Sequence, residues 1–330
     1  MYIMKMGPAY KDYIWGGTKL KTDFNKKSDL DIIAESWELS CHPNGKSIIL
    51  NGAYKGMTLD IFLEGDVTAV LGSNCEGMTK FPLLIKLIDA QADLSIQVHP
   101  DDELAFELEA DQIQQVDKTK QTESGKTEVW IVLDCEPESG IYYGFNRSVS
   151  KEELSTAIKD GTILELLNNV KVKKGDVFFI KPGTIHALGA GTVIAEIQQN
   201  SDITYRLYDY NRRDANGEPR PLHIEKSILC ADLKPVTKQE PQKGYLVSNE
   251  YFMVKKLTVS DLITEYAGED SFQALLIIKG EGLVQHGNNI IEFIKGDCLF
   301  VLANTGEYEI KGNCEILLSS VGVSKRGIAK

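Results

Sequence analysis

The chain lacks the paired cysteines, long apolar runs and basic excess that mark several large classes of protein. Its six cysteines are scattered and form no CxxC pair, which argues against a disulfide framework or a cysteine-type zinc site and favours free thiols in a reducing compartment. No apolar stretch approaches the roughly 20 residues that span a bilayer, and residues 1–20 lack the pattern of a secretory signal. The net charge of −12 argues against binding to nucleic acids or anionic membranes. We therefore expect a cytoplasmic protein with neither kind of partner.

The most frequent pattern is a short run of β-forming residues enclosed by glycine, proline or asparagine. With 330 residues, 42% hydrophobic and 25% charged, the chain has an ordinary globular composition and is long enough for two domains. Short runs with closely spaced turns are typical of antiparallel sandwiches and barrels. We predict a mainly β fold, with strands near residues 83–88, 129–133, 177–180, 193–198, 252–259, 274–278, 298–302 and 315–319.

Helical periodicity is confined to a few segments. Ser150 and Glu153 form a capping box at the start of one of them, and Asp101 and Asp102 lie at the positive end of another. Residues 234–243 contain two prolines and no periodicity, which predicts a linker. We place a larger domain at 1–240 and a smaller one at 241–330, and expect helices at residues 58–63, 101–110, 150–167 and 222–233.

A weak internal repeat crosses this linker. Lys-Gly-Asp at 174–176, an apolar strand and Pro-Gly-Thr-Ile-His at 182–186 have a counterpart in Lys-Gly-Asp at 295–297, an apolar strand and Ala-Asn-Thr-Gly-Glu at 303–307. The spacing from the first glycine to the last residue is the same in both copies. Only the first copy ends in histidine, so we predict that the second is a structural copy without a metal.

Four polar side chains at the edges of β-runs form the most specific chemical pattern. Gln97 and His99 are two residues apart, so on a strand they point to the same face. Glu128 opens an apolar strand, and His186 follows the end of another. One amide oxygen, two imidazoles and one carboxylate make a plausible divalent metal site. The mixed nitrogen and oxygen donors suit zinc, with positions left open for water or substrate.

Several short motifs surround these residues, and as a set they resemble a known family. They are Ser-Ile-Gln-Val-His-Pro-Asp-Asp at 95–102, Gly-Lys-Thr-Glu at 125–128, Pro-Gly-Thr-Ile-His-Ala-Leu-Gly at 182–189, Ile-Trp-Gly-Gly at 14–17, Glu-Ser-Trp-Glu at 35–38, His-Pro-Asn-Gly at 42–45 and residues 196–206. Their order resembles that in type I mannose-6-phosphate isomerases of the cupin superfamily. The chain length is similar to that of the short bacterial form, and the motifs cover about residues 10–230.

The resemblance implies a double-stranded β-helix, the cupin jelly roll. The catalytic, metal-binding domain would be residues 1–240, and the C-terminal cupin-like domain, 241–330, would hold no metal. One zinc ion per chain would be held by Gln97, His99, Glu128 and His186. The implied reaction interconverts mannose 6-phosphate and fructose 6-phosphate through an enediolate, so the expected partner is a small sugar phosphate. We expect a monomer or a homodimer.

The resemblance also suggests which other side chains take part. The candidate catalytic residues are Arg206, Lys86, Lys126 and Asp202, and the candidate substrate-binding residues are Ser95 and Arg212. A lysine beside a divalent cation has its pKa lowered and can serve as a base near neutral pH. Lys86 is the first candidate for that base and Lys126 the second, whereas an arginine stays charged and can only hold an anion.

Two departures from the family pattern affect the handling of the sugar. Many members carry Gly-x-Thr-Pro-Lys after the arginine, but here the segment is residues 207–212, and Arg212 would replace the lysine with a forked cation. Gly125 lies where some relatives have histidine, so a ring-opening role proposed for that histidine does not transfer. His42 and His223 are expected to be structural.

Two other functions fit the same metal ligands. An Fe(II) cupin oxygenase would use more histidines than His99 and His186. A non-catalytic sugar-binding protein would have no need of Lys86, Lys126 and Arg206 together.

Overall fold

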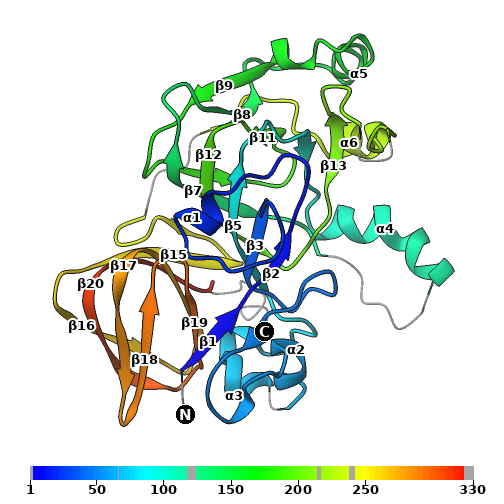
Figure 1. Cartoon of the computed structure of the whole chain (residues 1–330). Coiled ribbons are helices and arrows are strands. Elements are labelled where there is room, and N and C mark those ends of the chain that lie inside the picture. Colours follow the sequence, from blue (N-terminus) through cyan, green and yellow to red (C-terminus); the bar gives the residue numbers. More distant parts are fainter. Residues whose placement is uncertain (1–2, 66, 117–123, 214–216, 238–241, 323–330) are drawn as a thin grey trace. The chain divides into compact units, whose positions relative to one another are not determined.

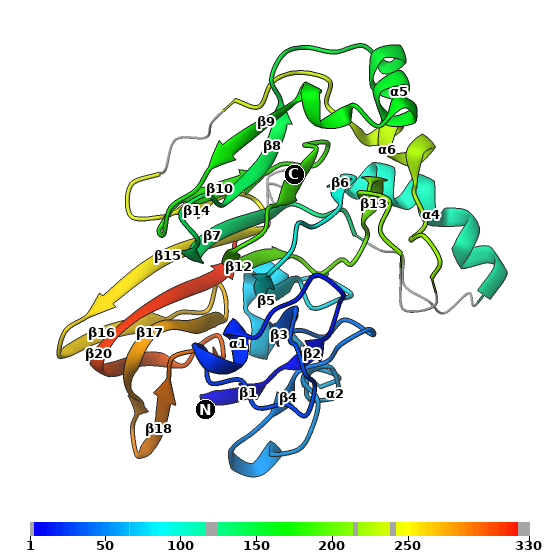
Figure 2. The same ribbon diagram turned by 45° about the horizontal axis from the view of Figure 1, so that its top comes forward.

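The computed structural model describes residues 3–65, 67–116, 124–213, 217–237 and 242–322 (Figures 1 and 2). The chain forms two compact units. The first combines residues 1–12, 18–88 and 240–330, and the second combines residues 13–17 and 89–239. The predicted boundary between residues 240 and 241 lies outside the described residues, so the division into two functional domains stays a prediction.

The first unit is built mainly from antiparallel strands. Its largest sheet has the order β14-β15-β20-β17-β19-β1-β4, with β16 beside β20 and β18 beside β17. In β18 buried Ile291 and Phe293 alternate with exposed residues, as expected for a strand with one face on a core. The bounds are β1 Met4–Gly7, β4 Ile48–Ile49, β14 Val247–Ser248, β15 Phe252–Val259, β16 Leu262–Ala267, β17 Gln273–His286, β18 Asn289–Ile294, β19 Cys298–Val301 and β20 Gly306–Val321.

A smaller group of strands and several short helices complete the first unit. Strand β3 pairs with β2 on one side and with β5 on the other. Strand β5 is buried along its whole length, which explains its almost unbroken apolar sequence. The bounds are β2 Ala9–Lys11, β3 Glu35–Leu39, β5 Leu83–Ala90, α1 Lys19–Thr22, α2 Leu59–Phe62, α3 Val67–Leu71 and the 3-10 turns η1 Gly52–Tyr54 and η2 Ser73–Cys75.

The second unit contains two groups of antiparallel strands. One has the order β10-β7-β12, and the other has the order β13-β6-β11-β8-β9. An apolar core that includes Ile96, Phe145 and Leu207 packs against the second group. The bounds are β6 Ile96–Val98, β7 Glu128–Cys135, β8 Gly140–Phe145, β9 Leu167–Lys171, β10 Val177–Ile180, β11 His186–Leu188, β12 Thr192–Gln199 and β13 Tyr205–Tyr208.

The helices of the second unit largely follow the sequence predictions. Helix α4, Asp102–Val116, is longer than predicted, and Asp101 Oδ1 caps it by accepting from the Leu104 amide at 2.8 Å. Helix α5, Lys151–Asp160, begins at the predicted cap, where Ser150 Oγ accepts from the Glu153 amide at 3.1 Å. The remaining bounds are η3 Ile163–Leu166 and α6 Ile224–Cys230.

The predicted helix over residues 150–167 is wrong in its second half. Helix α5 stops because Gly161 takes a left-handed conformation with φ 72° and closes it, and the 3-10 turn η3 follows. The predicted short strands are all present. Within the described residues, no helix has both the length and the apolar character needed to cross a membrane.

Candidate metal centre and arginine cluster

The register of three neighbouring strands places the first group of predicted residues on one face. On β6, Gln97 lies directly opposite His186 of β11 on one side and opposite Arg206 of β13 on the other. Residues opposite each other in an antiparallel pair point to the same face. His99 follows Gln97 by two residues, and its carbonyl accepts from the Gly183 amide at 2.9 Å. The sheet therefore presents Gln97, His186 and Arg206 side by side.

Glu128 comes from the other strand group of the unit and converges on the two histidines. It opens β7, between Ile180 of β10 and Gln198 of β12. Its Oε1 lies 3.2 Å from His186 Nε2, and its Oε2 lies 3.6 Å from His99 Nε2. Among the described residues these three form one group whose ligand atoms all lie within 4.8 Å of one another. They are at most 1% exposed.

The hydrogen bonding of this group fits a bound cation. His186 Nδ1 lies 2.8 Å from the Thr184 carbonyl, which can only accept, so Nδ1 carries a proton and Nε2 has the lone pair in the neutral ring. That lone pair faces Glu128 Oε1, another acceptor. Neither Glu128 Oε1 nor His186 Nε2 has a hydrogen-bond partner among the described residues, whereas Glu128 Oε2 lies 3.1 Å from the Lys126 ammonium. Two buried acceptors that face one another repel, and a divalent cation between Oε1 and Nε2 would satisfy both.

The charge states of the ligands also suit a metal. Burial, followed by the charge of Lys126, lowers the pKa of His99 well below its ordinary value, so its imidazole is neutral. Burial alone would raise the pKa of Glu128, but the charge of Lys126 holds it well below the ordinary range. The group therefore offers a neutral imidazole at His99, a second imidazole at His186 and one carboxylate.

Lys126 is in direct contact with this group. Its Nζ lies 3.1 Å from Glu128 Oε2 and 3.2 Å from His99 Nε2, and the side chain is buried. Its neighbour Gly125 packs so closely that an added Cβ would lie 2.4 Å from the Asp101 carbonyl carbon. This close approach gives a structural reason for the glycine where some relatives have histidine.

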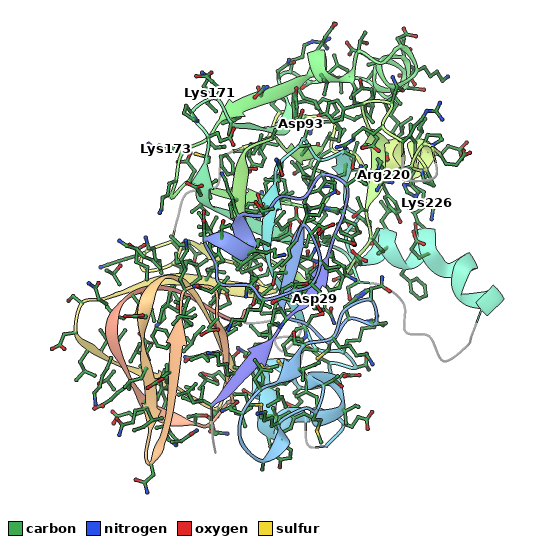
Figure 3. All side chains as sticks on the ribbon, in the orientation of Figure 1. Asp29, Asp93, Lys171, Lys173, Arg220 and Lys226 are labelled. Carbon is green, nitrogen blue, oxygen red and sulfur yellow. The ribbon has the colours of Figure 1, made fainter. Side chains whose placement is uncertain are left out.

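Arg206 leads into a second cluster, made of arginines around one carboxylate. Its Nε donates to Ser95 Oγ at 3.2 Å. The Asp209 carboxylate accepts from Arg220 Nε at 2.7 Å and also from Arg212. Burial, followed by the charge of Arg220, lowers the pKa of Arg206. Arg212 and Arg220 share the Asp209 carboxylate, and with Arg206 the three guanidiniums carry two more positive charges than this carboxylate neutralises. Figure 3 labels Arg220 and Lys226 on the side of the second unit formed by β13 and α6.

Asp209 and Arg220 were not predicted from the sequence. One feature of the sequence could have indicated this cluster: four arginines lie between residues 206 and 220, in a chain of net charge −12. The backbone carries a second signal, since Tyr210 and Asn211 both take left-handed conformations, with φ 54° each. Such conformations cost energy in non-glycine residues and concentrate at functional sites.

Two further predicted residues are Asp202 and Lys86. Asp202 is half-buried in the loop between β12 and β13, four residues before Arg206. Lys86 belongs to the first unit, where its Nζ lies 3.6 Å from Glu35 Oε2 and 5.2 Å from the centre of the Trp37 ring. The side chain is 3% exposed. Its surroundings are therefore those of a buried lysine beside a carboxylate.

Comparison with known proteins supports the fold and the order of the motifs. The chain matches the family described as phosphomannose isomerase type I, catalytic domain, over residues 3–136, and mannose-6-phosphate isomerase, cupin domain, over residues 242–321. A mannose-6-phosphate isomerase of Bacillus subtilis is 39% identical over 311 residues, covering 92% of this chain and 93% of that protein. One from Streptococcus mutans is 37% identical, covering 88% of this chain and 89% of the relative.

A solved structure agrees with the same relationship. The crystal structure of the mannose 6-phosphate isomerase from Bacillus subtilis superimposes with a TM-score of 0.86 at 37% sequence identity. The match covers 97% of this chain and 99% of that one. The predicted mainly β cupin fold is confirmed.

Proposed function

The chain belongs to the type I mannose-6-phosphate isomerase family, and we propose that it interconverts mannose 6-phosphate and fructose 6-phosphate with one zinc ion. The observation that carries the proposal is the convergence of His99, Glu128 and His186, whose buried acceptor atoms face one another. Gln97, directly opposite His186, would supply the fourth ligand.

The donor set favours zinc over other common ions. Two imidazoles, one carboxylate and one amide oxygen combine nitrogen and oxygen ligands, which suits zinc better than magnesium or calcium. When bound, the ion would polarise the oxygens of the open-chain sugar as a Lewis acid. With one carboxylate among the four ligands the centre keeps a net positive charge, which stabilises negative charge developing on oxygen.

The reaction also requires a proton to move between two carbons. A base removes the proton from C2 of the open-chain aldose, the enediolate forms, and a proton returns to C1 as the carbonyl moves to C2. We propose Lys86 and Lys126 as the groups that handle these protons, with Asp202, four residues before Arg206, as a further participant. Lys126 contacts both His99 and Glu128. Comparing the Lys86→Met and Lys126→Met variants for exchange of the C2 proton with solvent would identify which lysine removes it.

The arginine cluster would bind the phosphate group. We propose that Arg206, Arg212 and Arg220 hold this dianion, since guanidinium groups bind phosphate through paired hydrogen bonds. Ser95 would orient Arg206 through the bond to Nε. Arg220→Gln is expected to raise KM for mannose 6-phosphate about tenfold, as for the loss of one charged hydrogen bond. Arg213→Gln, at an exposed arginine that binds the Gly217 carbonyl, is the matched control and should leave KM unchanged.

One coupled assay tests the proposed function. Purified protein loaded with zinc should convert mannose 6-phosphate to fructose 6-phosphate, and His99→Ala should lose both zinc and turnover. His286→Ala, at the last residue of β17 in the first unit, should keep both. Full zinc occupancy without turnover would refute the isomerase. Oxygen consumption by the Fe(II)-loaded protein would then support the oxygenase instead.

A further inference from the structure

We propose that His223 is a positioning residue for Arg206. Its ring nitrogen and its backbone amide hold both main-chain polar groups of Arg206 at the edge of the sheet, and so fix the guanidinium on the face that carries Gln97 and His186. This inference rests on the proposed function, because it takes Arg206 to act on the substrate.

The contacts follow from the place of β13 at the edge of its sheet. Among the described strands, β13 has a partner, β6, on one side only. On the open side the Arg206 amide donates to His223 Nδ1 at 3.2 Å, and the His223 amide donates to the Arg206 carbonyl at 2.8 Å. A strand edge normally leaves such groups to solvent or to another chain. Here a single residue satisfies both.

The side chain of Arg206 is held by the same segment. Its Nη1 donates to the Pro221 carbonyl at 2.8 Å, two residues before His223. The pairing of β13 with β6 shifts register between Arg206 and Tyr208, so regular strand pairing does not by itself fix the backbone here. The segment from Pro221 to His223 therefore makes three hydrogen bonds to Arg206, in addition to the bond from Nε to Ser95.

The bond to the ring requires neutral His223. An amide can only donate, so Nδ1 must carry a lone pair and the ring proton must be on Nε2. The charged groups that face the ring are Arg206 of β13, Lys226 of α6 and Glu109 of α4, and the ring of Tyr205 lies 6.1 Å away. Burial, then Arg206 and Lys226, lower the pKa of His223, while Glu109 raises it. Protonation of His223 Nδ1 would place its N–H against the amide N–H of Arg206. The hydrogen bond would break and Arg206 would be released.

Two substitutions separate positioning from mere packing. His223→Asn keeps an acceptor oxygen at the place of Nδ1 and cannot be protonated near neutral pH, whereas His223→Leu keeps the bulk and removes the acceptor. We expect His223→Leu to lower kcat/KM on the order of 10- to 100-fold, as for a small displacement of a catalytic group. His223→Asn should stay within about threefold of the wild type at pH 7.5, since its acceptor remains. It should also lose less activity than the wild type as the pH is lowered.

The control and a double-mutant cycle make the test decisive. Glu225→Gln, at an exposed position on α6, should behave as the wild type. In an Arg206→Ala background, His223→Leu should cause no further loss, because it acts through Arg206. Zinc content and the thermal midpoint are measured for every variant.

The outcomes distinguish this inference from the proposed function. Equal losses in His223→Asn and His223→Leu, or a loss that adds fully to that of Arg206→Ala, would overturn the positioning role. If His223→Leu does not fold, the pH profile of His223→Asn decides, and a profile identical to the wild type overturns the role. A zinc-loaded wild type without turnover would instead overturn the proposed function, and this inference with it.

Discussion

The Lys-Gly-Asp turns of the two repeats make the same backbone hydrogen bonds, each within its own compact unit. The Gly175 amide donates to the Val132 carbonyl at 2.8 Å, and the Gly296 amide donates to the Ile277 carbonyl at 2.8 Å. Both glycines take left-handed conformations, with φ 92° and 96°. The predicted repeat is therefore present at the level of single hydrogen bonds, and the backbone does not distinguish the two copies here.

The side chains carried by the two copies differ in chemistry. Glu128 pairs with Ile180 in the first copy, and Gln273 pairs with Val301 at the equivalent place in the second. Glu128 Oε1 has no hydrogen-bond partner among the described residues, and Oε2 lies 3.1 Å from the Lys126 ammonium. By contrast, Gln273 Oε1 accepts from a tyrosine hydroxyl at 2.6 Å, and its Nε2 donates to a backbone carbonyl at 2.9 Å. The first position leaves a buried acceptor atom unsatisfied, and the second does not.

The same contrast extends along the strands. Trp130 and Glu196 are paired in the first copy, and Trp130 Nε1 donates to Glu196 Oε2 at 2.7 Å. The equivalent pair in the second copy is Leu275 and Leu318, both in an apolar core. One hairpin scaffold thus supports either a polar centre or an ordinary core, and a few side chains decide which.

The largest effect is expected when Glu128 of the first repeat is replaced by glutamine, the residue found at the equivalent place in the second repeat. Glu128→Gln removes the only carboxylate among the proposed zinc ligands. Zinc affinity should fall by more than the 10- to 100-fold that loss of an outer partner costs, and turnover should disappear. Competition with a chelator measures the zinc affinity, and the coupled assay measures turnover. The reciprocal control, Gln273→Glu, should create no zinc site, and wild-type affinity in Glu128→Gln would contradict the assigned ligand.

Residues whose role depends on strand register could be predicted from the sequence. The alternation of side chains along a strand and the residues that form turns are local features of the sequence. Gln97, His99 and His186 come together as expected, and so do the two Lys-Gly-Asp turns. Asp209 and Arg220 were missed because their ion pair depends on the path of an irregular loop with no periodicity. The contact of His223 was missed for another reason: its partner is a backbone amide, which no residue pattern reveals.

A smaller effect should distinguish the two turn glycines by stability. An added Cβ at Gly296 would lie 2.0 Å from the Phe24 carbonyl oxygen, whereas at Gly175 nothing lies within 4 Å. Gly175→Ala should therefore cost only the left-handed conformation, about 1 to 2 kcal/mol. Gly296→Ala adds a backbone clash and should cost roughly 3 kcal/mol or more. Urea unfolding of both variants measures the difference, and equal costs would show that the turns are packed alike.

The smallest effect on stability is expected at two carboxylates, one in each unit, that each bind two cationic side chains. Asp209, 5% exposed, binds Arg212 and Arg220, whereas Glu315, with a side chain 22% exposed, binds two lysines. Burial alone would raise the pKa of Asp209, but the two arginines lower it. A carboxylate with a lowered folded-state pKa stabilises the protein above its unfolded pKa of about 3.9, and this contribution is lost as the pH falls through the folded value.

Asp209→Asn should therefore lower the free energy of unfolding by about 1 to 3 kcal/mol at pH 7, since it removes charged hydrogen bonds and leaves the arginines to repel one another. The difference from the wild type should shrink below roughly pH 4. Glu315→Gln should change stability by less than about 1 kcal/mol, and salt should weaken that change further, because its ion pairs are closer to solvent. Urea unfolding at several pH values measures both. If the free energy of unfolding of Asp209→Asn differed from that of the wild type by the same amount down to pH 3, the aspartate would act through its shape and not through its charge. The arginine cluster would then not depend on the charge of Asp209 for its stability.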